Sequence, residues 1–315
     1  MSKLDELKLE LKNIGKEYAK LKTLEPSERK AFGEKINAKK NDLLRKIAEE
    51  ESKLESAALE PIDFSAPFGI NSAPASFKKG SIHPLSRELA LITEIYANMG
   101  FDVIEARQLD DEFHMFESLN FPEGHPARDG YDTFRTEEGF IPPAHTSTMQ
   151  YRALTLFKEN LDRDENIAVV IPGRVFRNED VDATHEHTFY QCEGIFVSKD
   201  ATLGDLLGTW KNFFETYYGE KLNIKTQPGY FPFTEPSVEF LIEKPKSLGG
   251  KGDGWLEMGG CGMIHPNVLK TAGIDPEVYK GFAFGGGIDR LVMLKYGITD
   301  VRYFESGKLE FLKEF

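Results

Sequence analysis

Apolar residues recur every three or four positions at the start of the chain. This spacing places them on one face of a helix, in the a/d pattern of a coiled coil. Glu25-Pro26 interrupts the pattern, because proline lacks an amide hydrogen and biases its predecessor away from the helical conformation. A second stripe follows, so residues 1–58 are predicted to form an antiparallel helical coiled-coil arm. The stripes comprise Leu4, Leu7, Leu11, Ile14, Tyr18 and Leu21, then Phe32, Ile36, Leu43, Ile47 and Leu54.

The segment that follows the arm has a different composition. Residues 59–80 contain three prolines among Ser, Ala and Gly, which predicts a linker. The body, residues 81–315, opens with Pro84 at a helix start, an apolar face from Leu85 to Met99, and Gly100 as the stop. A strand over residues 101–105 is expected next.

Short β-rich runs dominate the rest of the body. Their alternation predicts an antiparallel sheet with one packed and one open face, and the order of elements lacks regular βαβ units. The fold class is therefore α+β, with a sheet flanked by helices. Helices are expected near residues 148–159, 203–221, 267–272 and 288–296.

Composition narrows the class of protein. No apolar run approaches the roughly 20 residues needed to span a bilayer, and the start has no apolar signal segment, so a cytoplasmic protein is expected. Two cysteines are too few for a disulfide framework. The net charge of −13 argues against coating nucleic acid. Residues 1–60 carry 14 Lys and Arg against 13 Asp and Glu, a net +1, and the remainder carries −14. The arm is thus the better polyanion contact, although a dimerisation or spacer coil explains it equally well.

Candidate chemistry is concentrated in residues 173–194, GRVFRNEDVDATHEHTFYQCEG. The pattern predicts a strand ending at Arg177, a loop over residues 178–187 and a strand from Thr188. Side chains alternate along a strand, so Phe189, Gln191 and Glu193 share a face. A guanidinium can bind a phosphate bidentately, and a nearby carboxylate such as Glu179 can accept from an amino group.

Two other interpretations of this stretch remain open. His185 and His187, with His145 or His265, offer a weak zinc pattern that no cysteine pair supports. The other interpretation is an ordinary hairpin with a charged tip.

Near the C-terminus, a short strand over residues 281–284 leads into three glycines and a helix containing Arg290. Glycines allow a flat ligand to approach the backbone, and neither a Rossmann turn nor a P-loop fits this sequence.

Three separated pieces occur in a characteristic order: a His-Pro helix before a strand, F-R-x-E in a strand-loop-strand, and G-x-G-x-x-R opening a helix. In this order they resemble the signature motifs of class II aminoacyl-tRNA synthetases. The resemblance extends over essentially the whole chain to the alpha subunits of bacterial phenylalanyl-tRNA synthetases. The segments that carry it are residues 116–134, 145–152, 182–194, 230–239 and 255–269.

The resemblance implies a ligase that uses ATP and forms AMP and diphosphate. Phenylalanine and MgATP would form phenylalanyl-adenylate, and the acyl group would pass to tRNA(Phe). It also implies a beta subunit in an (αβ)₂ heterotetramer and an arm that contacts tRNA. No zinc is expected, because the histidine pattern is weak and no cysteine pair supports it. Among the departures, Asp289 stands where many members have Glu.

The resemblance also assigns roles to residues. Arg177 and Arg290 would be the catalytic arginines, on the α-phosphate and on the γ-phosphate or base. Glu235 would hold Mg²⁺ together with the beta subunit. ATP would be bound by Arg177, Glu179, His185, Phe189, Gly285 and Arg290, and phenylalanine by His145, Ser147, Gln150, Gln191, Glu193, Phe231, Phe233 and Ala283.

Two sequence details bear on the phenylalanine pocket. Phe231 and Phe233 are two residues apart and are expected on one strand face, where they can meet the substrate ring edge-to-face. Ala283 would form the pocket floor.

Two alternative functions remain: a class II synthetase paralogue that makes an adenylate without charging tRNA, and a non-catalytic adaptor that uses the coil. The adaptor would leave Arg177, Glu179 and Arg290 without a role.

Overall fold

A computed structural model describes residues 3–19, 26–58, 81–128, 133–248 and 254–315. The chain divides into two compact units, Met1–Lys78 and Lys79–Phe315. The predicted linker over residues 59–80 lies entirely outside the described ranges, as do Leu21 and the side chains of Tyr18 and Leu54. Within these ranges, no helix has the length and apolar character needed to cross a membrane.

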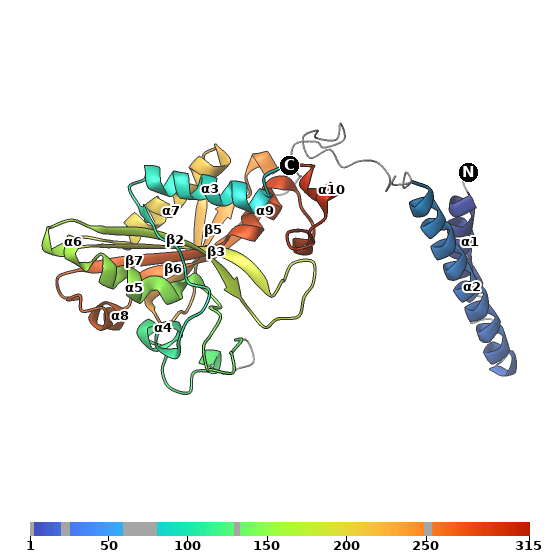
Figure 1. The fold of residues 1–315 in the computed structure, drawn as a ribbon, viewed down its shortest axis with the longest axis horizontal. Coiled ribbons are helices and arrows are strands. Elements are labelled where there is room, and N and C mark those ends of the chain that lie inside the picture. Colours follow the sequence, from blue (N-terminus) through green and yellow to red (C-terminus); the bar gives the residue numbers. More distant parts are fainter. Residues whose placement is uncertain (1–2, 20–25, 59–80, 129–132, 249–253) are drawn as a thin grey trace, which may run out of the picture. The chain divides into compact units, whose positions relative to one another are not determined.

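The N-terminal unit contains two paired helices, α1 (Lys3–Ala19) and α2 (Pro26–Ala58) (Figure 1). Helix α2 begins at the proline that interrupts the sequence pattern. Lys3 and Lys8 near the start of α1 form ion pairs of 2.9 and 2.8 Å with Glu50 and Glu51 near the end of α2, so the helices are antiparallel. The predicted helical hairpin is therefore confirmed, while its supercoiling stays a prediction. Its apolar contacts involve Leu7, Leu11, Ile14, Phe32, Ile36 and Leu43.

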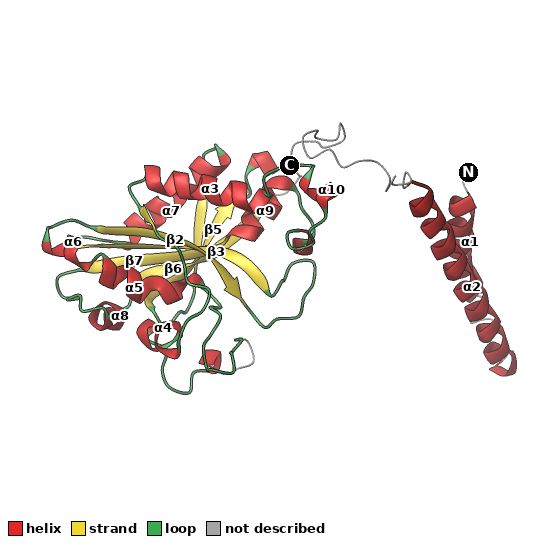
Figure 2. Ribbon diagram, viewed as in Figure 1, coloured by secondary structure: helices red, strands yellow, loops and turns green. Residues whose placement is uncertain are grey.

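A seven-stranded sheet forms the centre of the second unit, with strand order β1-β2-β3-β7-β6-β5-β4 (Figure 2). Adjacent strands of the sheet pair antiparallel, except for β1 and β2, which pair in parallel. The predicted α+β class with an antiparallel sheet is confirmed. The strands are β1 (Asp102–Val103), β2 (Ile167–Phe176), β3 (Thr188–Ser198), β4 (Ile224–Pro228), β5 (Thr234–Glu243), β6 (Trp255–Ile264) and β7 (Lys280–Gly287).

Helices cover both faces of the sheet, because side chains of successive residues point to opposite sides of each strand. One core joins the sheet to α3 (Pro84–Asn98), α7 (Leu203–Tyr218) and α9 (Ile288–Tyr296). A second core joins the other face to α5 (Gln150–Leu156), α6 (Lys158–Asp162) and α8 (Pro266–Thr271). Figure 1 shows the two groups of helices on opposite sides of the sheet. Two shorter helices are α4 (Glu112–Met115) and α10 (Leu309–Leu312).

Local signals account for several helix boundaries. Helix α3 begins at Pro84, and His83 caps it by accepting a hydrogen bond from the amide of Leu85. Helix α7 begins with a capping box and ends before Gly219, which has φ +69°, so it stops short of the predicted Lys221. The helix expected over residues 148–159 is wrong as a single element: a 3₁₀ turn over Thr146–Met149 precedes α5, and a break at Phe157 separates α5 from α6.

Three strand predictions also need correction. Strand β7 continues through the three glycines, because Gly285, Gly286 and Gly287 pair with β3. Phe231 and Phe233 do not lie on a strand: they occupy a turn in which the amide of Thr234 donates to the carbonyl of Phe231 at 3.2 Å. The edge strand β1 contains only two residues, Asp102 and Val103, of the strand predicted over residues 101–105.

Candidate active site

A cavity of about 1170 Å³ opens over the face of the sheet where strands β3, β7 and β6 meet. Its floor is low because Glu193, Gly285 and Gly260 are aligned across the three strands, and the two glycines have no side chains. A Cβ added at Gly285 would lie 2.8 Å from a carboxylate oxygen of Glu193. Glycine at this position therefore leaves room for the Glu193 carboxylate and allows a ligand to lie close to the backbone.

The hairpin of β2 and β3 supplies one side of the cavity. Phe189, Gln191 and Glu193 line it, whereas Cys192 is buried in the core on the opposite face of the sheet. This confirms the alternation predicted for residues 189–193. The amide of Arg177 donates to the carbonyl of His187 at 2.9 Å, so the hairpin loop closes one residue beyond β2.

Arg177 is held in the cavity by contacts on several sides. Its Nε donates to the carbonyl of Ala144 at 3.0 Å, and its guanidinium lies 5.0 Å from the centroid of the Phe189 ring. A terminal nitrogen lies 3.7 Å from a carboxylate oxygen of Glu179. These three side chains, which the sequence assigned to one nucleotide site, therefore line the same end of the cavity.

The hairpin loop orients His185 through a single carboxylate. Asp182 Oδ1 accepts from the amides of Thr184 and His185 at 2.6 and 2.8 Å, and His185 Nδ1 lies 3.1 Å from the same oxygen. Hydrogen bonds from Thr184 and His185 hold the pKa of Asp182 well below its usual range. His185 lines the cavity, with its imidazole fixed through Nδ1.

Glu193 is a buried acidic group of the cavity, four residues beyond Phe189 on strand β3. Its carboxylate accepts from Ser147 Oγ at 2.9 Å, Gln150 Nε2 at 2.6 Å and Thr146 Oγ1 at 3.4 Å. Burial raises the pKa of Glu193 to about 7, and these hydrogen bonds oppose the rise. Ser147 also lines the cavity. Gln150 is fully buried and is connected to the cavity through Glu193 instead of lining it.

An aromatic wall stands beside Glu193. The rings of Phe231 and Phe233 lie 5.9 Å apart, and the His145 ring lies 6.2 Å from that of Phe233. Burial, and then the charge of Arg177, lowers the pKa of His145 to about 4, so its imidazole is neutral. All three line the cavity, as does Ala283 of β7. The turn brings the two phenylalanines together even though the predicted strand is absent.

Helix α9 brings Arg290 to the cavity. Its neighbour Asp289 is buried, and its Oδ2 accepts from the amide of Tyr190 at 2.6 Å. Burial raises the pKa of Asp289 to about 7, and the bond from Tyr190 opposes the rise. Asp289 thus ties the first turn of α9 to strand β3, next to Phe189.

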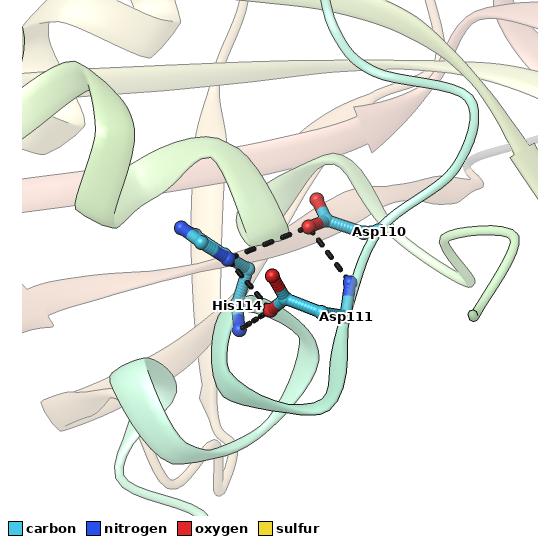
Figure 3. Close-up of side chains that lie close together, drawn as sticks. All are labelled: Asp110, Asp111 and His114. Atoms are coloured by element: carbon cyan, nitrogen blue, oxygen red, sulfur yellow. Dashed lines mark hydrogen bonds and ion pairs between the residues drawn. The ribbon is translucent and has the colours of Figure 1, made fainter. Parts of the chain in front are cut away.

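The histidine-based zinc pattern is not assembled among the described residues. His187 Nδ1 lies 3.2 Å from the carbonyl of Arg177, and His265 caps α8 by accepting from the amide of Asn267. Within the described ranges, the single group of three potential metal ligands is Asp110, Asp111 and His114, shown in Figure 3.

That group is explained by other contacts. Arg152 donates two hydrogen bonds of 2.8 Å to Asp110, whose side chain is fully buried. Asp111 caps α4 by accepting from the amide of His114. Each carboxylate in Figure 3 thus has a structural partner within the chain. The Mg²⁺ residue expected from the sequence, Glu235, is exposed at the start of β5 and does not line the cavity.

Sequence reasoning missed several residues of the site. Thr146 bonds to Glu193, and its amide donates to Gln191 at 3.3 Å. Phe121 lines the cavity from a segment 110 residues away from the Phe231 turn. Both positions had an available signal: Thr146 lies directly between His145 and Ser147, and Phe121 lies in the segment 116–134 that carries the family resemblance. Further residues lining the cavity are His125, Tyr230, Thr234, Glu239, Gly260 and Glu257.

Comparison with known families adds to this geometry. The family model "tRNA synthetases class II core domain (F)" matches residues 62–315, and "Aminoacyl tRNA synthetase class II, N-terminal domain" matches residues 4–61. The mixed helices and largely antiparallel sheet agree with that core. The fold and the site thus define a class II aminoacyl-tRNA synthetase.

Curated relatives resolve the class further. The chain is 39% identical over 310 residues to the phenylalanine–tRNA ligase alpha subunit of Cellvibrio japonicus, covering 97% of this chain and 88% of that protein. It is 40% identical to that of Sodalis glossinidius (94% and 86% covered) and 39% identical to that of Bacillus cytotoxicus (93% and 85% covered). The chain belongs to the family of phenylalanine–tRNA ligase alpha subunits.

Proposed function

We propose that this chain is the catalytic alpha subunit of a phenylalanine–tRNA ligase. It activates phenylalanine with ATP, forming phenylalanyl-adenylate and diphosphate, and transfers the phenylalanyl group to tRNA(Phe). The observation that carries the proposal is one continuous cavity, lined both by Arg177, Glu179 and Phe189 and by Glu193 with the wall of Phe231 and Phe233. A nucleotide and an aromatic amino acid require these two kinds of surface next to each other.

The amino-acid end accounts for each part of phenylalanine. The ammonium group is held by Glu193 with Ser147 and Gln191, and Gln150 supports Glu193 from behind. The phenyl ring lies against Phe231 and Phe233 above Ala283, where ring-to-ring contacts contribute about 0.5–1.5 kcal/mol beyond burial. His145, neutral at physiological pH, adds a polar edge without repelling the ammonium group.

The nucleotide end accounts for ATP. Phe189 stacks on adenine, Glu179 accepts from its amino group, and Gly285 lets the nucleotide lie close to the sheet. His185 and Arg290 contact the β- and γ-phosphates or cover the base. Arg177, held by Ala144 and Phe189, faces the α-phosphate.

The activation step needs little proton transfer. A carboxylate oxygen of phenylalanine attacks the α-phosphorus, a new O–P bond forms, and the bond to the diphosphate leaving group breaks. Arg177 and Arg290 neutralise the charge that accumulates on the phosphoryl oxygens. Because the reaction depends on positioning and charge, a site built from fixed donors and aromatic surfaces suits it.

Magnesium is proposed as the metal that accompanies ATP. Mg²⁺ prefers oxygen ligands and neutralises the triphosphate when bound. Glu235 offers an exposed carboxylate at the start of β5, outside the cavity, which suits a metal position shared with a second subunit. The partner is the beta subunit, in an (αβ)₂ heterotetramer in the cytoplasm. The α1–α2 arm, as a coiled coil over residues 1–58, contacts tRNA and is joined by the linker 59–80 to the catalytic domain 81–315.

The test is phenylalanine-dependent ATP–diphosphate exchange by the chain co-expressed with its beta subunit. We expect Arg177→Ala to reduce exchange by at least 100-fold, because one preorganised charge at the transferring phosphoryl group contributes roughly 3–4 kcal/mol. Arg163→Ala is the matched control, since Arg163 is exposed and pairs with Glu165 outside the cavity. Exchange that does not require phenylalanine, or that survives Arg177→Ala, would refute the assignment. Charging of tRNA(Phe) measured in parallel tests the transfer step, and exchange without charging would remove it.

A further inference from the structure

Asn120 makes two side-chain hydrogen bonds close to the aromatic wall, although it does not itself line the cavity. Its Nδ2 donates to the carbonyl of Pro232 at 2.7 Å, and its Oδ1 accepts from Asn267 Nδ2 at 2.9 Å. The orientation of the amide is chemically determined, because the carbonyl of Pro232 can only accept. Asn120 therefore links helix α8 to the turn that carries Phe231 and Phe233.

Pro232 lies between the two cavity phenylalanines and is buried. Proline has no amide hydrogen, so its carbonyl is the one backbone group by which a hydrogen bond can hold it. The neighbouring carbonyls are held elsewhere: Phe231 accepts from Thr234, and Phe233 accepts from the amide of His265 at 2.9 Å. The bond from Asn120 thus completes the anchoring of the turn at its centre.

The backbone conformation of Asn120 suits this role. The residue has φ +59° and ψ +26°, the left-handed region, directly after a 3₁₀ turn over Glu117–Leu119. Asparagine and aspartate tolerate this region better than other residues with side chains. The reversal of the chain at Asn120 directs Phe121 to the cavity, where its ring lies 6.1 Å from that of Phe233. One short segment therefore supports both the backbone and a ring of the wall.

We propose that Asn120 is a positioning residue for the phenyl-binding wall, acting through the carbonyl of Pro232. The inference rests on the proposed function, in which Phe231 and Phe233 receive the substrate ring. Asn120 touches neither substrate. It sets the separation and tilt of the two rings, so its loss weakens phenylalanine binding while leaving the ATP end of the cavity intact.

Asn120→Asp provides the sharpest test. Aspartate keeps the size of asparagine, its tolerance of positive φ and its acceptor for Asn267, but when ionised it cannot donate to the carbonyl of Pro232. In exchange assays of the complex we expect the KM for phenylalanine to rise about tenfold, with kcat and the KM for ATP changing less than twofold. Asn223→Asp is the matched control, because Asn223 donates to Glu243 at an exposed position on another loop.

Hydrogen–deuterium exchange over residues 230–234 provides a readout independent of activity. We expect faster exchange of these amides in Asn120→Asp than in the parent complex or the control. Asn267→Ala, at an exposed position, removes one of the two bonds and should raise the KM for phenylalanine two- to threefold; it keeps the test available if Asn120→Asp does not fold. An unchanged KM together with unchanged amide exchange in these variants overturns the proposal, as do equal rises of both KM values. Failure of the proposed function gives a different result: the parent complex then shows no phenylalanine-dependent ATP–diphosphate exchange. In that case the hydrogen–deuterium exchange of residues 230–234 alone decides whether Asn120 positions the turn.

Discussion

Replacing Glu193 with glutamine tests the charge at the amino-acid end of the cavity. Burial raises the pKa of Glu193 from 4.5 to about 7, even though Ser147 and Gln150 donate to its carboxylate. A pKa change of this size corresponds to roughly 3 kcal/mol between the protonated and ionised forms. The ligand-free cavity therefore holds a mostly protonated Glu193 at pH 6 and a mostly ionised one at pH 8.

Phenylalanine binding should follow this titration, because its ammonium group pairs with the ionised carboxylate. About one-tenth of the carboxyl groups are ionised at pH 6 and about nine-tenths at pH 8, so the KM for phenylalanine should fall roughly tenfold across that range. In Glu193→Gln this slope disappears. The KM at pH 8 should rise about 100-fold, since a charge-assisted hydrogen bond contributes roughly 2–3 kcal/mol.

The same substitution has the opposite effect on stability. The folded chain holds the Glu193 proton more tightly than the unfolded chain, so this contribution is fully present below pH 4.5 and is lost as the pH rises through about 7. Glutamine does not ionise. The stability of Glu193→Gln relative to the parent should therefore improve by roughly 3 kcal/mol between pH 4 and pH 8. Asp289 has a pKa raised in the same direction, but it titrates in both proteins and cancels.

Exchange kinetics from pH 6 to pH 8 test the predicted change in KM, and thermal unfolding of the complex at pH 4 and pH 8 tests the predicted change in stability. The KM for ATP serves as the internal control, because Glu193 lies at the phenylalanine end. A parent KM for phenylalanine that stays flat over this range would refute the reasoning, as would a glutamine variant that keeps the pH slope. A Tm difference between variant and parent that does not change with pH would refute the burial argument separately.

Two further substitutions test the shape of the cavity. Ala283→Gly removes a methyl group from its floor and should admit para-substituted phenylalanines, lowering their KM at least tenfold in the exchange assay; unchanged discrimination would contradict the placement of the ring. Gly260→Ala places a Cβ 2.4 Å from the Phe231 ring, so the ring must move and the KM for phenylalanine should rise at least tenfold at constant KM for ATP. An unchanged KM for phenylalanine would show that the Phe231 ring is not part of the binding surface.

Local patterns in the sequence were sufficient where the physical cause is itself local. Pro84 set the start of α3, and Pro26 set the start of α2. Alternation along β3 placed Phe189, Gln191 and Glu193 on one face of the sheet. These predictions succeeded because they depend on local backbone geometry: proline favours the first turn of a helix, and side chains alternate between the two faces of a strand.

Predictions that depended on neighbouring strands were less accurate. The predicted strand ended at Phe284, yet pairing with β3 extends it through Gly287. Phe231 and Phe233 suggested a strand by their spacing, but a turn satisfies their backbone groups instead. A distant partner, strand β3, decided the first outcome. The second combines a local bond from Thr234 to Phe231 with a distant one from His265 to Phe233, and the spacing of the two phenylalanines carries no information about either bond.

The sequence by itself determined which residue types are available for chemistry: two arginines, a hairpin of alternating polar side chains, and an aromatic pair. Only the tertiary structure decided how they act. Burial among Thr146, Ser147 and Gln150 raises the pKa of Glu193, and no local pattern encodes burial. Asn120 meets Pro232 across 112 positions of the chain. Contacts over such separations form only when the whole domain folds. Folding brings distant segments within hydrogen-bonding distance and excludes the water that would otherwise screen these contacts.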